Sequence, residues 1–183
     1  MGGGSAEQPF RWLHKKSFAL RLSFAKFRKI QTNRIMNTHT IRLHRVLRAS
    51  PEKVYGAFLD ADAKVKWLPP YGFTAKVHHL EPKVGGTYKM SFTNFTTGQS
   101  HSFGGTYQEL VPNERLRYTD KFDDPNLPGE LQVTIILKKV SVGTELTIEQ
   151  AGVPAVIPTE MCYLGWQESL AQLAQLVEPE ITG

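Results

Sequence analysis

From Phe73 to Gln150, apolar and polar residues alternate with a period of two, and turn residues interrupt the alternation repeatedly. A period of two is typical of strands with one buried face, and short connections make consecutive strands antiparallel neighbours. The run therefore predicts a curved antiparallel sheet with one face that another element must cover. The predicted strands are Thr74–Leu80, Gly86–Phe95, Ser100–Leu110, Arg115–Phe122, Leu131–Val140 and Thr144–Gln150.

One long helix is predicted after these strands, between Thr159 and Val177. Tyr163, Trp166 and Leu170 recur at the spacing of one helix face, and the apolar stripe continues to the end of the segment. A helix of this kind needs an apolar surface to lie on. We expect it to pack on the open face of the sheet.

A strand and two short helices are predicted ahead of the alternating run. Thr40–Leu47 has the pattern of a strand, which brings the sheet to about seven strands. Ser50–Glu52 begins a helix, because it supplies a serine cap, a proline at the first helical position and an acid in the first turn. A second helix, from about Asp62 to Trp67, ends before two consecutive prolines, which cannot continue it.

The positive charge of the chain is concentrated in its first 35 residues. The 183 residues carry a formal net charge of +5, yet residues 1–35 hold eight basic residues against the single acid Glu7. Residues 36–183 are therefore slightly acidic, and we expect them to form a single domain. A mildly acidic domain lacks the positive field that attracts polyphosphate, so we expect no nucleic-acid partner.

Residues 1–35 form a basic extension with apolar residues at helical spacing, and we expect it to be disordered or loosely helical. Three interpretations stay open: an organelle-targeting peptide, a segment that rests on an anionic membrane surface, or an extension without a role, since Met36 directly precedes the first strand. A membrane partner is expected only through this segment.

Cysteine content gives an expectation about the compartment. The single cysteine, Cys162, can form neither an intramolecular disulfide nor a thiolate metal site. A lone thiol suits a reducing compartment, so we expect a cytoplasmic protein. No stretch approaches the ~20 apolar residues of a membrane-spanning helix.

Short fragments in a fixed order resemble the small proteins similar to the C-terminal domain of the activator of Hsp90 ATPase, within the START-like or polyketide cyclase superfamily. The resemblance covers about residues 38–177. The fragments are Ser50–Tyr55 followed by Trp67, then Gly85–Tyr88, Gly105–Tyr107, Glu114–Leu116, Gly143–Leu146 and Gly165-Trp166.

The resemblance implies an α+β helix-grip fold, in which a curved sheet surrounds a long C-terminal helix and a cavity lies between them. It implies a protein that binds an apolar or amphipathic small molecule in that cavity. Two alternatives remain: an enzyme of the cyclase or hydrolyase type that uses the same cavity, and a module that activates an Hsp90-type chaperone. The last rests on analogy of fold alone.

Candidate ligand-binding residues follow from the implied cavity together with strand alternation, which places every second side chain on the inner face. Most are aromatic, as the walls of small-molecule sites commonly are. They are Trp67, Phe73, Tyr88, Met90, Phe92, Phe103, Tyr107, Tyr118, Asp120, Phe122, Gln150, Trp166 and Leu170.

Three of the polar residues on these faces are candidates for acid or base chemistry: Asp120, His101 and Tyr107. A buried carboxylate needs a partner or a raised pKa, and such groups occur where proteins bind ligands or move protons. The alternative is that Asp120 lies near a strand end in water. The residues do not decide whether a reaction is catalysed, and we expect no metal and no cofactor.

Overall fold

The computed structural model describes residues 38–180, so the expectations for residues 1–35 lie outside the described residues. The described residues form seven strands and three helices. In chain order they are β1 (Thr38–Leu47), α1 (Pro51–Leu59), α2 (Ala61–Trp67), β2 (Phe73–Leu80), β3 (Thr87–Asn94), β4 (Ser100–Val111), β5 (Arg115–Phe122), β6 (Leu131–Val140), β7 (Gly143–Pro154) and α3 (Thr159–Val177).

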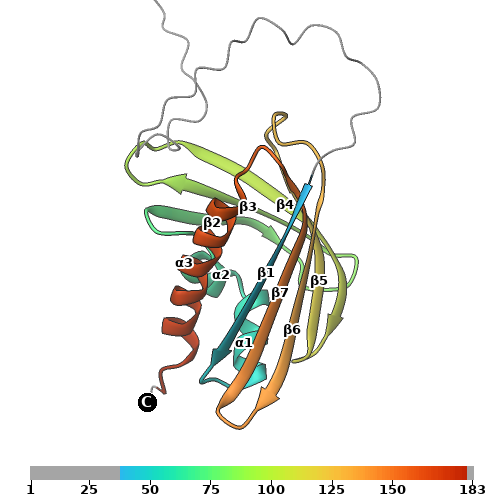
Figure 1. The fold of residues 1–183 in the computed structure, drawn as a ribbon, viewed down its shortest axis with the longest axis vertical. Helices are drawn as coiled ribbons and strands as arrows, with labels where there is room; N and C mark the ends of the chain where they lie inside the picture. Colours follow the sequence, from blue (N-terminus) through green and yellow to red (C-terminus); the bar gives the residue numbers. More distant parts are fainter. Residues whose placement is uncertain (1–37, 181–183) are drawn as a thin grey trace, which may run out of the picture. The chain divides into compact units, whose positions relative to one another are not determined.

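The seven strands make one antiparallel sheet in the order β1-β7-β6-β5-β4-β3-β2. Neighbours in sequence are neighbours in the sheet from β2 to β7, and β1 pairs with β7 to form one edge. The sheet curves strongly, so that β2, β3 and β4 cross the direction of β1, β7 and β6 (Figure 1). The predicted helix-grip architecture is confirmed.

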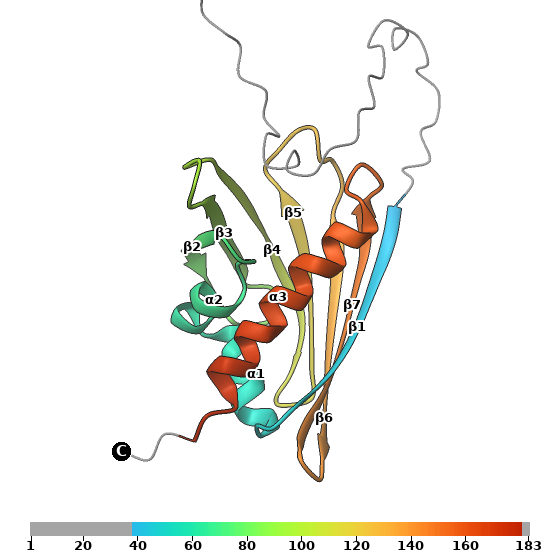
Figure 2. The ribbon, with the colours of Figure 1, turned by 60° about the vertical axis from the view of Figure 1, so that its left-hand side comes forward.

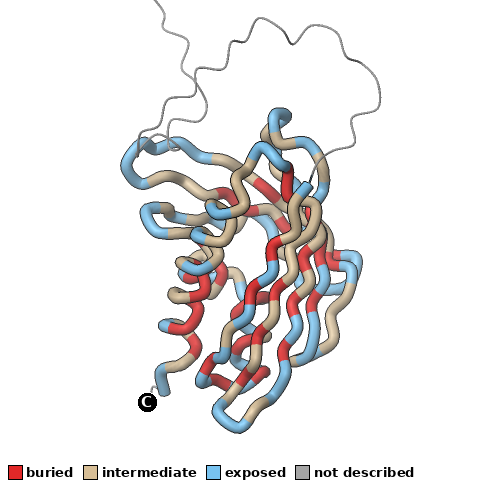
Figure 3. The backbone as a smooth tube through the Cα atoms, in the orientation of Figure 1, coloured by how far each residue is buried: buried red, intermediate tan, exposed pale blue. Residues whose placement is uncertain are grey.

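Helix α3 lies on the concave side of the sheet, and α1 and α2 close one end of it (Figure 2). Burial follows this arrangement: buried positions alternate along the strands and gather where the helices face them (Figure 3). On α3 the buried side chains all belong to the C-terminal half, at Ser169, Leu170, Leu173, Ala174 and Val177. The N-terminal half of α3 is less deeply buried, and its Cys162, Tyr163 and Trp166 are only partly covered.

The two short helices begin as the sequence predicts. The Ser50 hydroxyl accepts a hydrogen bond from the backbone N–H of Lys53 at 3.4 Å and caps α1. The Asp60 carboxylate accepts from the N–H of Ala63 at 2.7 Å and caps α2. These caps fix the direction of α2, whose inward side chains help to build the site described below.

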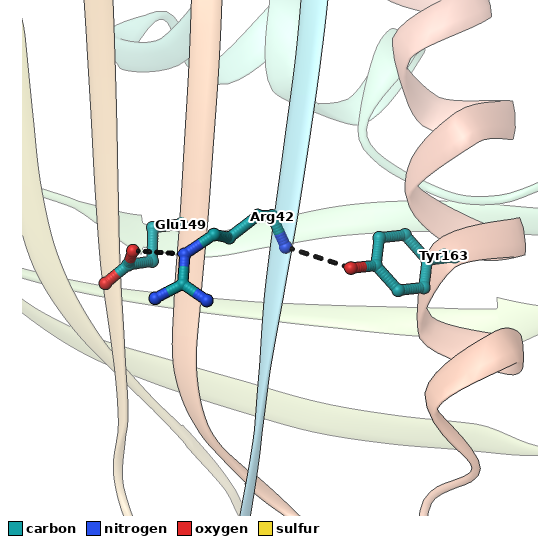
Figure 4. Close-up of polar contacts among 3 residues, drawn as sticks. All are labelled: Arg42, Glu149 and Tyr163. Carbon is teal, nitrogen blue, oxygen red and sulfur yellow. Dashed lines mark hydrogen bonds and ion pairs between the residues drawn. The ribbon is translucent and has the colours of Figure 1, made fainter.

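The edge strand β1 is joined to α3 by a hydrogen bond. The backbone N–H of Arg42 donates to the Tyr163 hydroxyl at 3.3 Å, while the guanidinium of Arg42 pairs with Glu149 of β7 at 2.9 Å (Figure 4). An edge strand has backbone donors that no neighbouring strand satisfies. The hydroxyl of α3 satisfies one of them and ties the N-terminal half of the helix to the sheet.

The β1–β7 pair extends beyond the predicted strands at one end. Pairing of Thr38 with Pro154 and of His39 with Val153 lengthens β1 and β7, with an irregularity between His39 and Thr40. The alternation of side chains is lost at that irregularity. The sequence pattern therefore understated both strands.

Candidate functional site

A cavity of about 240 Å³ lies between the inner face of the sheet, α2 and the N-terminal half of α3. Strands β3 to β7 all contribute side chains to it, and the wall is mainly apolar and aromatic. The residues around it are Lys64, Leu68, Pro70, Tyr88, Phe92, His101, Phe103, Tyr118, Asp120, Phe122, Val133, Gln150, Met161, Cys162, Gly165, Trp166 and Ser169.

The structure brings most of the residues predicted to bind ligand together on this wall. Their aromatic rings contact one another edge to face, as between Phe92 and Phe103, whose centroids lie 4.8 Å apart. His101, a candidate acid or base, lies on the wall beside Phe92. The predicted binding residues on the wall are Tyr88, Phe92, Phe103, Tyr118, Asp120, Phe122, Gln150 and Trp166.

The remaining candidates lie elsewhere. Trp67 is buried in the core, where its indole N–H donates to the Ala57 carbonyl at 2.8 Å. Met90, Tyr107 and Leu170 are also core residues. Phe73 is half-buried, with its ring centroid 6.1 Å from that of His101. Strand alternation alone does not separate residues of the core from residues that line the cavity, because both point inward.

Lys64 is the functional candidate that the sequence analysis missed. It belongs to α2, and only 3% of its surface is exposed. Its Nζ lies 4.8 Å from the centroid of the Tyr88 ring and 5.8 Å from that of Tyr118. Within residues 38–180, the ammonium group contacts these two rings and makes no hydrogen bond or ion pair.

A sequence signal for Lys64 exists in the spacing of α2. Lys64 stands three and four positions before Trp67 and Leu68, so the three side chains share one face of the helix. That face packs toward the interior, since Trp67 is buried and Leu68 lines the cavity. A lysine on an apolar helix face is uncommon, because lysine is almost never fully buried unless it is paired.

Burial changes the acid–base behaviour of Lys64 and Asp120 in opposite directions. Burial lowers the pKa of Lys64 to about 8, although the negative charge of Asp120 acts against this. Burial raises the pKa of Asp120 to about 7, although Tyr88 and Lys64 act against it. Both groups therefore titrate near neutral pH. Burial is the largest cause of both pKa shifts, and among the described residues no ion pair joins the two groups.

One oxygen of Asp120 is left without a partner. Its Oδ1 is buried and accepts no hydrogen bond from the described residues. The residue borders the cavity, so a molecule inside can reach the carboxyl group. Buried polar atoms are nearly always hydrogen-bonded, and an exception of this kind calls for a specific cause.

An interruption between β4 and β5 surrounds Asp120. The strands pair at Gly104 and again at Tyr107, but not at the two residues between them. There the Thr119 hydroxyl accepts from the N–H of Thr106 at 3.1 Å, and the Thr119 carbonyl accepts from the Tyr88 hydroxyl at 3.1 Å. Side-chain hydrogen bonds thus replace the regular backbone ladder next to the unpaired carboxyl group.

A close approach explains the glycine at this interruption. A Cβ on Gly105 would overlap the backbone carbonyl of Thr119. Any larger residue would push β4 away from β5, so this position requires glycine.

The polar side chains that α3 brings to the cavity wall already have hydrogen-bond partners within the protein. The Trp166 indole N–H donates to the Gln150 side-chain oxygen at 2.9 Å. The Ser169 hydroxyl donates to the Leu68 carbonyl at 2.6 Å and links α3 to the end of α2. These bonds fix the wall in place and occupy the polar groups of Trp166, Gln150 and Ser169.

His101 and Cys162 border the same cavity. Burial lowers the pKa of His101, with Asp124 acting against it, so the imidazole is neutral at physiological pH. Burial raises the pKa of the Cys162 thiol, and Glu160 adds to this, which makes the thiol a poor nucleophile. Across residues 38–180, no cluster of three or more histidine, cysteine or acidic side chains is arranged to hold a metal ion.

Residues 48–178 match the family described as Activator of Hsp90 ATPase homolog 1-like protein. The chain belongs to this family. No protein with a curated description matches it. Among residues 38–180, this family member has no helix that is both long and apolar enough to cross a bilayer.

Solved structures show the same fold in relatives of this Hsp90 ATPase activator-like chain. A Chromobacterium violaceum protein is 61% identical, with a TM-score of 0.76 over 77% of this chain and 98% of that one. A Nitrosomonas europaea protein is 22% identical, with a TM-score of 0.65 over 75% of this chain and 92% of the other. An AHSA1 protein from Silicibacter pomeroyi is 20% identical, with a TM-score of 0.65 over 75% and 96%.

Proposed function

We propose that this protein binds a small molecule with an apolar, ring-sized body and one anionic or hydrogen-bonding end. One observation carries the proposal: Lys64 and Asp120 border the same aromatic cavity, the Lys64 ammonium contacts only aromatic rings, and one oxygen of Asp120 has no hydrogen-bond partner among the described residues. Burying an ammonium or a carboxyl group without partners costs several kcal/mol. A ligand that supplies the missing partner would offset this cost.

The cavity volume limits the ligand. At about 240 Å³ the space is below the roughly 300–1,000 Å³ of sites for drug-sized molecules. A single ring with a short substituent is the appropriate scale. Burying about 150 Å² of ring surface contributes about 4 kcal/mol, which corresponds to a Kd of about 1 mM. A hydrogen bond to a charged group adds about 1.5–3 kcal/mol and brings the Kd to about 10–100 μM.

Benzoate and toluene separate the two contributions to affinity, because both bury an aromatic ring but only benzoate carries a charged group. Trp166 lies on the wall, so its fluorescence reports on occupancy, and Trp166→Phe shows which part of the signal it provides. At pH 6 we expect benzoate to bind about 10- to 100-fold more tightly than toluene. Lys64→Met should remove that advantage, because it deletes the ammonium but retains an unbranched apolar side chain.

The matched control is Lys66→Met, which changes an exposed lysine of the same helix. It should leave both affinities unchanged. Absence of any response of Trp166 to either compound up to about 10 mM would contradict the proposal, since burial of the ring alone predicts a Kd of about 1 mM.

The same observation supports a second candidate, an enzyme that transfers protons within the cavity. A carboxyl group with a pKa of about 7 can give and accept a proton at physiological pH. The test is exchange of the methyl protons of acetophenone in D₂O, followed by NMR. An enzyme should exceed the rate in buffer, and Asp120→Asn should return the rate to that of buffer. Equal rates with and without wild-type protein would reject proton transfer to this probe.

Activation of an Hsp90-type chaperone is a property named in the family description, and for this chain it stays a prediction. It requires stimulation of the chaperone ATPase when the two proteins are mixed. The cytoplasmic location expected from the lone cysteine is likewise a prediction, and fractionation of the source cells tests it.

A further inference from the structure

We infer that Lys64 forms a reversible covalent imine with small aldehydes or ketones that enter the cavity. The inference rests on the proposed function, since the carbonyl compound must first occupy that space. It adds a reaction site and a substrate class: a carbonyl group attached to a ring-sized apolar body.

The geometry favours Lys64 as the nucleophile. Its Nζ is near two aromatic faces on the cavity wall, and within the described part of the chain no hydrogen bond or carboxylate holds it elsewhere. An amine in this position has its lone pair available once it is deprotonated. Exposed lysines differ, since water stabilises their ammonium form; Lys53 also donates to the Pro179 carbonyl at 2.8 Å.

The surroundings also favour the neutral amine. Burial lowers the pKa of Lys64 to about 8, so a useful fraction of this side chain is the neutral amine at physiological pH. A lysine desolvated in an apolar pocket is a recognised nucleophile for carbonyl groups.

The reaction balances without a further reagent. The Nζ lone pair attacks the carbonyl carbon, so that a C–N bond forms and the C=O π bond breaks. The oxygen takes up one proton and the nitrogen loses one, which gives a neutral carbinolamine. The hydroxyl group then leaves as water after a second proton is added, and the nitrogen loses its proton to give the imine. Asp120 borders the same cavity and is the group placed to donate and recover these protons. No oxidant or reductant takes part.

Five other titratable groups border the cavity together with Lys64. They are Tyr88 on β3, His101 on β4, Tyr118 and Asp120 on β5, and Cys162 on α3. Burial raises the pKa of both tyrosines, so they stay neutral near pH 8, and His101 is neutral there as well. Asp120 is the charged neighbour that changes across this range, and its negative form keeps Lys64 protonated to higher pH.

Reductive trapping with benzaldehyde and cyanoborohydride tests the inference on the full chain. The reagent reduces an imine to a stable benzylamine, whereas an adduct with Cys162 is not retained. We expect one benzyl group per chain at low benzaldehyde concentration, located on Lys64 by peptide mapping. Its rate should reach half of its maximum near pH 8, while exposed lysines react appreciably only at higher pH.

Three variants complete the experiment. Lys64→Met should abolish the fast labelling, and Lys66→Met should leave it unchanged. Lys64→Arg keeps a positive charge without a nucleophilic amine, so it should also lose the label even if Lys64→Met folds poorly. Labelling spread over exposed lysines, with Lys64 no faster than Lys66, would overturn the inference.

Benzyl alcohol, which has the same ring and no carbonyl group, separates this inference from the proposed function. If benzyl alcohol changes the emission of Trp166 but benzaldehyde does not label Lys64, the imine is rejected and ligand binding stands. If neither compound occupies the cavity and no label appears, both are rejected.

Discussion

Replacing Asp120 by asparagine should stabilise the protein, by an amount that depends on pH. Asparagine resembles the protonated carboxyl group in shape, but it cannot ionise. The unfolded chain loses the proton of this carboxyl near pH 3.8, whereas the native state holds it to about pH 7. Between these values the native state binds more protons than the unfolded state, so wild-type stability falls as the pH rises.

The size of the effect follows from the difference between the two pKa values. About three pH units at about 1.4 kcal/mol each give about 4 kcal/mol at pH 7. Asp120→Asn should therefore match the wild type below pH 4 and exceed it by about 4 kcal/mol at pH 7. A domain of this size would show this as a rise in Tm on the order of 10 °C.

Urea denaturation between pH 4 and pH 7 measures the difference, with Glu114→Gln as the matched control at an exposed acid. The control should stay within about 0.5 kcal/mol of the wild type throughout. If Asp120→Asn and wild type give parallel stability curves across this range, the carboxyl group is not protonated in the native state. A carbon-13 NMR titration of the wild-type Asp120 carboxyl measures the same pKa without a variant.

Three other predictions concern the cavity and the strands that surround it. Benzoate should bind more weakly at pH 8.5 than at pH 6, because Lys64 loses its positive charge and Asp120 gains a negative charge over this interval; isothermal calorimetry at both values measures the change. Tyr107→Phe removes a buried hydroxyl that has no hydrogen-bond partner among the described residues and should stabilise the fold by about 1 kcal/mol. Tyr88→Phe leaves the Thr119 carbonyl without its hydrogen bond from Tyr88 and should destabilise the fold by about 1–3 kcal/mol. Thermal denaturation compares the two variants. Gly105→Ala should cost more than about 2 kcal/mol by the same assay, because its Cβ would overlap backbone that cannot move alone.

The sequence predicted the strands that alternate without interruption. Arg115–Phe122 and Leu131–Val140 have the same bounds in the prediction and in the structure, because most of their apolar residues recur at every second position between clear turns. The sheet order also follows from short connections. The far end of β7, up to Pro154, escaped prediction because its pairing with Thr38 depends on a distant strand.

The site was predictable only in part. Tyr88, Phe92 and Tyr118 were placed inward by alternation, but the same reasoning included Met90, which lies in the core. The difference depends on where α3 crosses the sheet, and residue spacing carries no information on that. Lys64 escaped because a lysine on a short helix is expected in water, and the apolar residues beside it received less weight than its charge.

The division of α3 into two halves affects how such a protein can change over evolution. Met161, Cys162 and Trp166 face the cavity, whereas Leu173 and Val177 hold the core. Substitutions in the first half of the helix can reshape the space for a ligand without removing the side chains on which folding depends. The same fold can therefore acquire new ligand preferences by changes along two turns of a single helix, while the buried side chains of the two turns that follow keep it stable.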